Sequence, residues 1–229
     1  MRQVFLDTET TGLDHNLGHR IIEIAAVEVI NRRITRNHFH IYLNPDREID
    51  AGAQEVHGIT LEFLQDKPRF ADVMSDFVRF VADAELIIHN APFDVGFLNA
   101  ELGRCGHHLL EHCCGNIIDT LKMAKEMRPG QRNNLDALCR HFGVDNSKRT
   151  LHGALLDAEL LADVYLAMTR GQESLMMELE DKPAGLVEQD VVVALTQPLV
   201  VLAATAQELD AHDAYLADLR AAGACVWDS

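Results

Sequence analysis

Two carboxylates near the start of the chain are placed so that they could do chemistry together. Asp7 and Glu9 follow the apolar run Val4–Leu6, and strand alternation would put both on one face, roughly 6.6 Å apart. Two like charges at that spacing repel each other unless cations hold them, so the pair favours a cation site. The same Asp-x-Glu pattern is common at strand ends and exposed turns, and alone it is a weak signal.

A third acid follows a second apolar run. Asp94 comes after Leu86–Ile88, in the first turn of a helix that should begin near Pro92 with Asn90 as its cap. An acid in a first helical turn is favoured by the helix dipole, so Asp94 by itself does not require a function.

The fourth acid, Asp157, heads the apolar stripe of a long helical pattern, in line with Leu161, Val164 and Met168. An unpaired charge on an apolar face is costly, so a metal ion or a cationic partner is the economical explanation. His152 lies five positions earlier, about 140° around an ideal helix. Both residues can therefore face one site only if His152 lies in the loop or first turn, a bend that Gly153 makes easy. The structural alternative is a capping or buried histidine.

Together, the four acids and the histidine are the side chains that phosphodiester hydrolysis by two metal ions requires. Two Mg²⁺ ions roughly 3.5–4 Å apart would stabilise the attacking and leaving oxygens of an in-line displacement. Carboxylate oxygens are the hard ligands that Mg²⁺ takes, and Mn²⁺ can substitute for it. Because a histidine titrates near neutral pH, His152 could accept the proton of the attacking water.

The elements that must position these side chains are predicted to form an α/β sheet covered by helices. Extended runs at Ile21–Val29 and Ile34–Leu43 are joined by a short polar segment, which suggests an antiparallel hairpin. Farther along the chain, strands alternate with helices, which indicates a mixed sheet with helices packed on it. The predicted helices cover Phe70–Val81, the segment after Pro92, Leu121–Met127, Leu135–Phe142 and Leu151–Met168, with a strand at Ile117–Ile118.

The composition describes an acidic protein with one sizeable core. Of 229 residues, 48% are hydrophobic, and the formal charge is −16 with a pI near 5.0. Such a chain cannot hold nucleic acid by its own charge, because phosphate contacts need cations; partners or metals must do so. No secretory signal opens the chain and no apolar stretch is long enough to span a bilayer, so we expect a cytoplasmic location and no membrane contact.

The cysteines fit a reducing compartment. Their number is odd, and no signal for export precedes them, so free thiols are expected. The segment Cys105–Cys114 also holds three histidines and could be a zinc site, but it lacks paired metal-ligand spacing, and ordinary thiols are favoured. The five cysteines are Cys105, Cys113, Cys114, Cys139 and Cys225.

The chain is predicted to divide into three parts, 1–169, 170–197 and 198–229. Periodicity is lost over 170–197, which is interpreted as a flexible linker. Beyond it, Thr205 and Glu208 form a capping box for a helix that should run to about Ala221. Some thirty residues cannot bury enough surface alone. This tail either packs on the first part or folds onto a partner, and the long linker favours the partner.

At the residues that carry the chemistry, the sequence resembles the DEDDh family of 3′→5′ exonucleases. The three motifs stand in the family's order, and the spacing from histidine to aspartate in the third is diagnostic. The resemblance implies a ribonuclease H-like fold and the proofreading removal of mispaired nucleotides from a single-stranded or frayed DNA 3′ end, with release of nucleoside 5′-monophosphates. The matching segments are Asp7–Gly12, Glu55–Thr60, His89–Asp94, Arg132–Leu138, Asn146–Ala154 and His152–Asp157.

The resemblance also implies a role for each residue. Asp7, Glu9 and Asp157 would bind the metal that activates the nucleophile, with Asp7 bridging to the second metal. Asp94 would support that second metal, and His152 would be the general base. Two further residues match positions that line the site for the 3′-terminal nucleotide, Thr10 and His57.

Two segments beyond residue 169 resemble partner-binding peptides. Gln172, Leu175 and Met177 match the pattern that replication proteins insert into a sliding clamp, although Met177 stands where a Phe is common. The tail from Leu199 to Trp227 resembles a segment that binds the catalytic (alpha) subunit of a replicative polymerase. Tethering by partners would raise the effective concentration of an acidic nuclease at DNA.

Two rival functions remain open from the sequence. A related exonuclease that trims RNA or short oligonucleotides would use the same metals, because discrimination depends on contacts at the 2′ position. A non-catalytic scaffold between clamp and polymerase is the alternative from another class, although it would have no need for five catalytic residues. The linker and tail argue against a stand-alone RNA trimmer.

Overall fold

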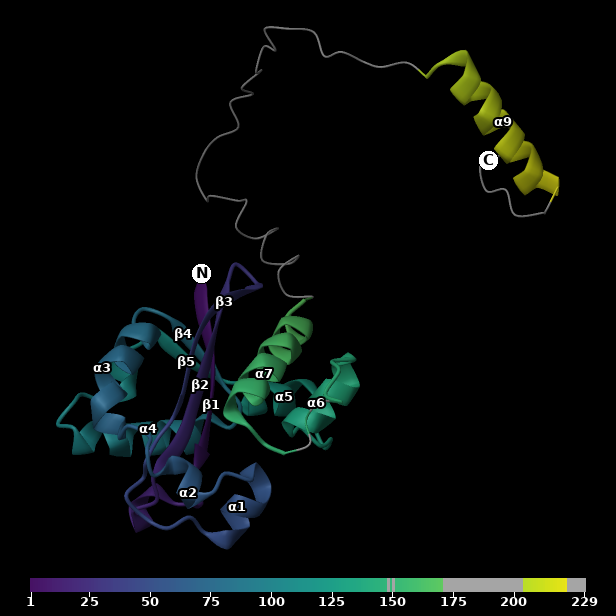
Figure 1. The fold of residues 1–229 in the computed structure, drawn as a ribbon. Helices are drawn as coiled ribbons and strands as arrows, with labels where there is room; N and C mark the ends of the chain where they lie inside the picture. The colour runs from purple at the N-terminus through teal and green to yellow at the C-terminus, as the bar shows by residue number, and fades with distance from the viewer. Residues whose placement is uncertain (148, 150, 171–203, 222–229) are drawn as a thin grey trace, which may run out of the picture. The chain divides into compact units, whose positions relative to one another are not determined.

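The computed structural model describes residues 1–147, 149, 151–170 and 204–221. Its centre is a five-stranded sheet in the order β3-β2-β1-β4-β5 (Figure 1). β1 pairs antiparallel with β2 and parallel with β4, so the sheet is mixed, as predicted. The strands are β1 (Arg2–Thr10), β2 (Ile21–Ile30), β3 (Arg33–Tyr42), β4 (Glu85–Ile88) and β5 (Asn116–Asp119).

The predicted hairpin is confirmed as β2 and β3. A two-residue turn joins the strands, and both of its residues, Asn31 and Arg32, have positive φ angles of 48° and 60°. Such turns match the right-handed twist of the strands that they connect. The register runs from Ile30 opposite Arg33 to Glu23 opposite Tyr42.

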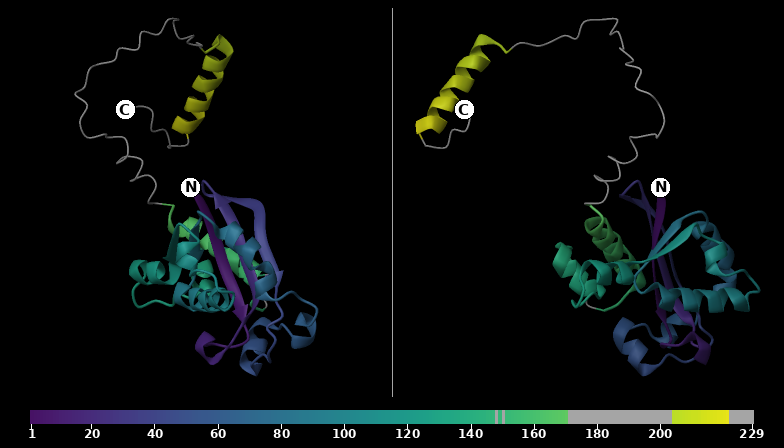
Figure 2. Two further views of the ribbon diagram at one scale, coloured as in Figure 1. Left: turned by 90° about the vertical axis from the view of Figure 1, so that its left-hand side faces the viewer. Right: turned by 180° about the vertical axis from the view of Figure 1, so that it is seen from behind.

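Helices cover both faces of the sheet (Figures 1 and 2). On one face, α3 (Phe70–Val81) and α4 (Ala91–Arg104) pack on a core that includes Val4 and Leu6 of β1. On the other, α5 (Thr120–Met127), α6 (Leu135–Phe142) and α7 (Ala154–Met168) pack on a core that includes Phe5. This alternation of Val4, Phe5 and Leu6 confirms the two faces predicted for the first strand. Shorter helices are η1 (His15–Leu17), α1 (Ala51–His57), α2 (Leu61–Leu64) and η2 (Leu110–His112).

A crevice lined by Asp7 of β1 and by His89, which follows β4, lies where the parallel strands end. β1 pairs with β4 only as far as Leu6, opposite Ile88, and then continues to Thr10 with β2 as its partner. The chain leaves β4 at this point, and two residues separate the strand from α4. Ligands of open α/β sheets bind at the carboxyl ends of parallel strands, so this edge is where a site is expected.

Two details differ from the sequence prediction. α7 begins at Ala154, three residues later than predicted, because Gly153 is extended and the N–H of His152 donates to the carbonyl of Val56 instead. Asn90 does precede α4, but it has a positive φ of 65° and its side chain makes no capping hydrogen bond. Its backbone N–H donates to Asp119 Oδ1 at 3.1 Å. Asn90 therefore forms part of the turn before α4 and does not cap the helix with its side chain.

The described part of the tail is the helix α9 (Ala206–Ala221). The predicted capping box is confirmed, since Thr205 N donates to Glu208 Oε2 at 2.8 Å and Glu208 N donates to Thr205 Oγ1 at 3.3 Å. The linker, with the predicted clamp-binding Gln172, Leu175 and Met177, lies outside the described residues. Within the described ranges, no helix is long and apolar enough to cross a membrane.

The zinc alternative at Cys105–Cys114 is not supported. Cys113 Sγ lies 3.8 Å from His107 Nδ1, whereas Cys105 and Cys114 pack against the apolar core beside α4. Among the residues that the structure describes, no group of three metal-binding side chains forms there. Cys225 lies outside the described residues.

Candidate active site

The four predicted acids come together at the crevice, although they belong to three segments. β1 supplies Asp7 and Glu9 on one face, α4 supplies Asp94 in its first turn, and α7 supplies Asp157. Glu9, Asp94 and Asp157 are buried, with exposed fractions of 8%, 3% and 3%. Four carboxylates in so little water create a strong demand for positive charge.

The pKa values of these acids reflect the lack of positive charge around them. Burial, followed by the neighbouring charges of Asp94, Glu9 and Asp157, raises the pKa of Asp7 well above its ordinary range. Burial and the nearby charge of Glu23 raise the pKa of Glu9 to about 8. Burial also raises the pKa of Asp94 to about 7. These acids repel one another without a cation, which is the electrostatic signature of a metal site or a catalytic centre.

Asp94 is fixed by a hydrogen bond from the opposite face of β1. The hydroxyl of Thr8 donates to Asp94 Oδ1 at 2.7 Å, and both groups are buried. Thr8 points to the opposite face of β1 from Asp7 and Glu9. The end of this strand therefore carries two acids and also orients a third. This bond partly offsets the effect of burial on the pKa of Asp94.

Asp157 differs from the other acids because it has a cationic partner. Arg149 donates from Nε to Oδ1 at 2.5 Å and from Nη2 to Oδ2 at 2.6 Å. Burial alone would raise the pKa of Asp157, but the hydrogen bonds and charge of Arg149, together with the nearby imidazole of His152, lower it below its ordinary value. Arg149 also donates from Nη1 to Asp136 Oδ1 at 2.9 Å, which anchors the arginine to the first turn of α6.

His152 lies in the loop before α7, where its predicted partnership with Asp157 is possible. Its Nδ1 is 3.3 Å from Asp157 Oδ2 and accepts a hydrogen bond of 2.9 Å from Arg149 Nη2. The side chain is about half exposed, at 48%. One ligand atom each of Glu9, His152 and Asp157 lie within 4.8 Å of one another, the one such group among the described residues.

Glu23 is a further buried acid beside the cluster that the sequence reasoning missed. It stands opposite Glu9 in the β1–β2 register, is 2% exposed, and accepts from His40 Nε2 at 2.7 Å. Its other oxygen accepts from the backbone N–H of Ala154 at 3.2 Å, at the start of α7. Glu23 therefore ties the start of the helix that carries Asp157 to β2, the strand paired with the one that carries Glu9.

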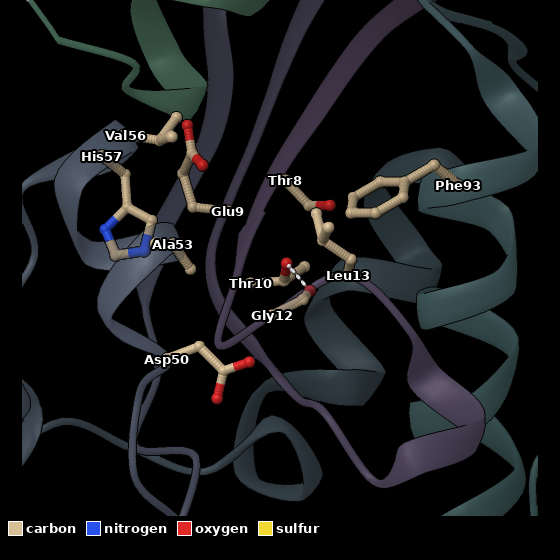
Figure 3. Close-up of a pocket in the computed structure, with 11 residues that line it drawn as sticks. Thr8, Glu9, Thr10, Gly12, Leu13, Asp50, Ala53, Val56, His57 and Phe93 are labelled. Atoms are coloured by element: carbon tan, nitrogen blue, oxygen red, sulfur yellow. Dashed lines mark hydrogen bonds between the residues drawn. The ribbon is translucent and has the colours of Figure 1, made fainter.

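Thr10 and His57 line a hollow of about 460 Å³ next to Glu9. In Figure 3, Glu9 and His57 stand on one side of it and Leu13 and Phe93 on the other. His57 Nδ1 accepts from Ile59 N at 3.0 Å, so Nε2 carries the proton, and this buried atom has no hydrogen-bond partner. An orphaned donor in an apolar hollow beside acids suits a polar ligand, because an unmade hydrogen bond there is costly.

The residues at the crevice fit divalent cations. The donor set consists of carboxylate oxygens and one imidazole, the hard and intermediate ligands that Mg²⁺ and Mn²⁺ accept. Carboxylates whose pKa values are raised by burial and mutual repulsion are the groups that a cation would stabilise most. The structure thus brings together Asp7, Glu9, Asp94, His152 and Asp157, and it puts Thr10 and His57 at the adjoining hollow.

Fold and site together define a nuclease of the ribonuclease H-like class. The sequence model of the exonuclease family (RNase_T) matches residues 4–165. A solved structure of exonuclease X with 5′-overhanging duplex DNA is 28% identical, with a TM-score of 0.59, over 75% of this chain and 93% of its own. The nuclease domain of 3′hExo, a DEDDh family member bound to rAMP, has a TM-score of 0.64 at 18% identity over 74% and 92%, which shows the shared fold.

Relatives that match the whole chain narrow the class. The DNA polymerase III subunit epsilon of Pasteurella multocida is 52% identical, over 99% of this chain and 93% of its own length. The subunit of the same name from Escherichia coli is 49% identical, over 99% and 97%. This chain therefore belongs to the exonuclease family and, within it, to the epsilon subunits of DNA polymerase III. It is a 3′→5′ exonuclease.

Proposed function

We propose that the chain removes mispaired nucleotides from the 3′ end of a DNA primer as the proofreading subunit of DNA polymerase III. The observation that carries the proposal is the convergence of Asp7, Glu9, Asp94 and Asp157 in one buried, electrostatically unfavourable cluster. That cluster has a half-exposed histidine at its mouth and a lined hollow at its side. These are the parts that hydrolysis of a terminal phosphodiester requires.

Each acid has a role in this proposal. Asp7, Glu9 and Asp157 would hold one Mg²⁺ ion, and Asp7 and Asp94 the second. When bound, the two ions would activate the attacking water and neutralise the charge of the leaving oxygen. Thr8 keeps Asp94 oriented through its 2.7 Å hydrogen bond, and Glu23 keeps α7 in place through the N–H of Ala154. A well-oriented ligand set does not have to be reorganised during the reaction.

His152 would take the proton of the attacking water. A base needs a free lone pair, and in the structure Nδ1 uses its lone pair to accept from Arg149 Nη2. Arg149 must therefore release His152 before the imidazole can act. A neutral, partly exposed imidazole can pass the proton on to solvent, which is the usual task of a general base.

The hollow beside Glu9 would receive the terminal nucleotide. Leu13 and Phe93 offer apolar surface for a base, and the orphaned Nε2–H of His57 would donate to a sugar or phosphate oxygen. The hydroxyl of Thr10 donates to the carbonyl of Gly12 at 2.7 Å, which fixes the wall of the hollow at the strand end. Both residues would thus position the nucleotide and take no part in bond breaking.

Partners would supply the affinity for DNA that an acidic chain lacks. We propose that the segment 198–229 binds the polymerase alpha subunit and that Gln172, Leu175 and Met177 bind the sliding clamp, in the cytoplasm. The described helix α9 has exposed apolar side chains, Leu209 at 53% and Tyr215 at 62%, that a partner could cover. Tethering raises the local concentration of the nuclease without new contacts to DNA.

Release of nucleotides from a 3′-labelled DNA strand, with Mg²⁺ or with a chelator, tests the proposal directly. A strand of RNA with the same sequence serves as the comparison. Stepwise loss that requires Mg²⁺ and is weaker on RNA is expected. A preference for RNA would make the chain an RNA-trimming enzyme, and no cleavage of either strand would make it a scaffold.

A further inference from the structure

A basic surface lies beside the active site of this acidic protein. The whole chain has a formal charge of −16, yet residues 120–142 contain five Lys and Arg against two Asp and Glu, a local balance of +3. These residues form α5, the following loop and α6, on the same side of the sheet as α7 (Figure 1). The positive charge is therefore concentrated on the elements that border the site.

Part of this surface is a hollow that contains no acid. We name it the arginine hollow, and its lining is Arg128, Gln131, Arg132, Ala137, Arg140 and His141. The side chains of Arg132 and Arg140 are exposed, and within the described residues they make no hydrogen bond or ion pair. Arg128 uses only Nη1, which donates to Asn133 Oδ1 at 3.2 Å and to the carbonyl of Arg132 at 3.3 Å. Most of its guanidinium group stays available.

The arginine hollow is adjacent to the catalytic acids along α6. The residues 134–136, at the start of that helix, line a second hollow together with Asp7, His152 and Asp157. Ala137, one residue farther, already lines the arginine hollow. α6 is held in this position by its buried Leu135 and Leu138 and by the Asp136–Arg149 ion pair at 2.9 Å.

We propose that the arginine hollow binds the phosphate backbone of the strand whose 3′ end lies in the active site, a few nucleotides before that end. The inference rests on the proposed function and names the path of its substrate. A strand that leaves the acidic cluster would be repelled by the rest of the chain, and free guanidinium groups are the side chains that best match phosphate oxygens. Contacts of this kind are independent of sequence, which suits a nuclease that must accept any mispair.

The test compares a long and a short substrate. In the double variant Arg132→Gln, Arg140→Gln of the full chain, KM should rise roughly 10–30-fold at about 0.1 M salt for a single-stranded oligonucleotide of about 15 nucleotides. The dependence of log KM on log salt should weaken by about 1.4, since each lost contact to single-stranded nucleic acid removes about 0.7. The p-nitrophenyl ester of thymidine 5′-monophosphate occupies only the active site and should be hydrolysed normally.

The matched control is Arg33→Gln, Arg36→Gln, which removes the same charge from exposed positions on β3 at the far edge of the sheet. The charge-reversing pair Arg132→Glu, Arg140→Glu should show a larger effect than the glutamine pair. If the hollow variants and the control variants had equal KM values and equal salt slopes, the arginine-hollow proposal would be overturned. This would hold even if the hollow bound some other acidic partner. If the unsubstituted chain hydrolysed neither substrate, the proposed function would fail, and this inference with it.

Discussion

Arg149 forms a two-pronged ion pair with Asp157, from Nε to Oδ1 at 2.5 Å and from Nη2 to Oδ2 at 2.6 Å. Both side chains are nearly inaccessible, at 7% and 4% exposure. A buried carboxylate that loses its partner destabilises a protein by about 3–5 kcal/mol, so the guanidinium group supplies the charge that a metal ion would otherwise bring. The two cations should therefore substitute for each other.

We expect Arg149→Met to lower the melting temperature in a chelator by roughly 6–20 °C and by much less in Mg²⁺, because a bound ion would replace the lost charge. Thermal unfolding with and without Mg²⁺ measures both values. The control is Arg2→Met, which removes the 2.7 Å ion pair with Glu28 at the other end of β1. Its melting temperature should fall by the same amount in the chelator and in Mg²⁺. An equal loss for Arg149→Met as well would mean that the arginine only packs.

Stability without metal should fall as pH rises. Burial and the charge of Glu23 raise the pKa of Glu9 from 4.5 to about 8, so between these values the folded chain keeps a proton that the unfolded chain has released. The folded state then binds more protons, and the free energy of unfolding decreases across that window. Asp94 acts in the same direction up to about pH 7.

Melting temperatures from pH 5 to 8.5 check this expectation, a range that covers most of the window between the two pKa values of Glu9. The decline should be steeper in a chelator than in Mg²⁺, because a cation stabilises the ionised acids. Glu9→Gln removes the titrating group and should flatten the decline. A Glu9→Gln protein with an unchanged slope would show that other groups carry the pH dependence.

Removal of an acid that we propose to bind metal should abolish hydrolysis and leave the fold intact. Loss of a residue that only supports a ligand costs about 10–100-fold, so Asp7→Ala or Asp157→Ala should exceed that. Circular dichroism would report the fold, and release of labelled nucleotides would report activity. Asp163→Ala, which removes an exposed acid of α7 six positions beyond Asp157, should keep full activity. A fully active Asp7→Ala protein would refute the metal assignment.

His152→Ala should reduce turnover by about 10²–10⁴-fold, the usual contribution of a general base, with little effect on melting temperature since the side chain is half exposed. The pH profile of the remaining activity should differ from that of the unsubstituted chain, because the group that accepts the proton is gone. Rates measured from pH 5.5 to 9 with the oligonucleotide substrate provide the check. An unchanged profile would assign His152 a structural role.

Deletion of residues 198–229 should spare hydrolysis of single strands and abolish binding to the polymerase alpha subunit. The described fold has its own core, and none of its core residues lies beyond Met168. Co-purification of the two subunits measures the binding. A truncated chain that still co-purified with the alpha subunit would mean that the contact lies elsewhere.

Much of the fold was predictable because local patterns determine it. The hairpin, α3 and the capping box of α9 each follow from neighbouring residues, and their bounds agree with the prediction to within a residue or two. The grouping of Asp7, Glu9, Asp94, His152 and Asp157 could also be predicted, since each acid stands where an apolar element ends or turns polar.

The contacts that complete the site could not be predicted. Glu23 meets Ala154 across 131 positions of sequence, and the only signal for it was a charge inside the apolar run Ile21–Val29. Arg149 lies in a loop without periodicity, and its partner depends on how that loop packs against α6 and α7. Asn90 has the residue type of a side-chain cap, but the tight turn after β4 forces a positive φ, which moves its side chain out of capping position.

β1 is the middle strand of the sheet. The part of the active site that it carries should therefore resist local unfolding better than the part carried by a loop. Asp7 and Glu9 belong to the central strand, which pairs with β4 as far as Leu6 and with β2 as far as Thr10, so their backbone amides should exchange with solvent hydrogen only when the sheet itself opens. His152 and Arg149 belong to a surface loop, whose amides should exchange through local opening. On heating, the loop should open, and activity should be lost, at a lower temperature than the one at which β1 unfolds. Because the sheet is still folded at that temperature, the activity should return on cooling.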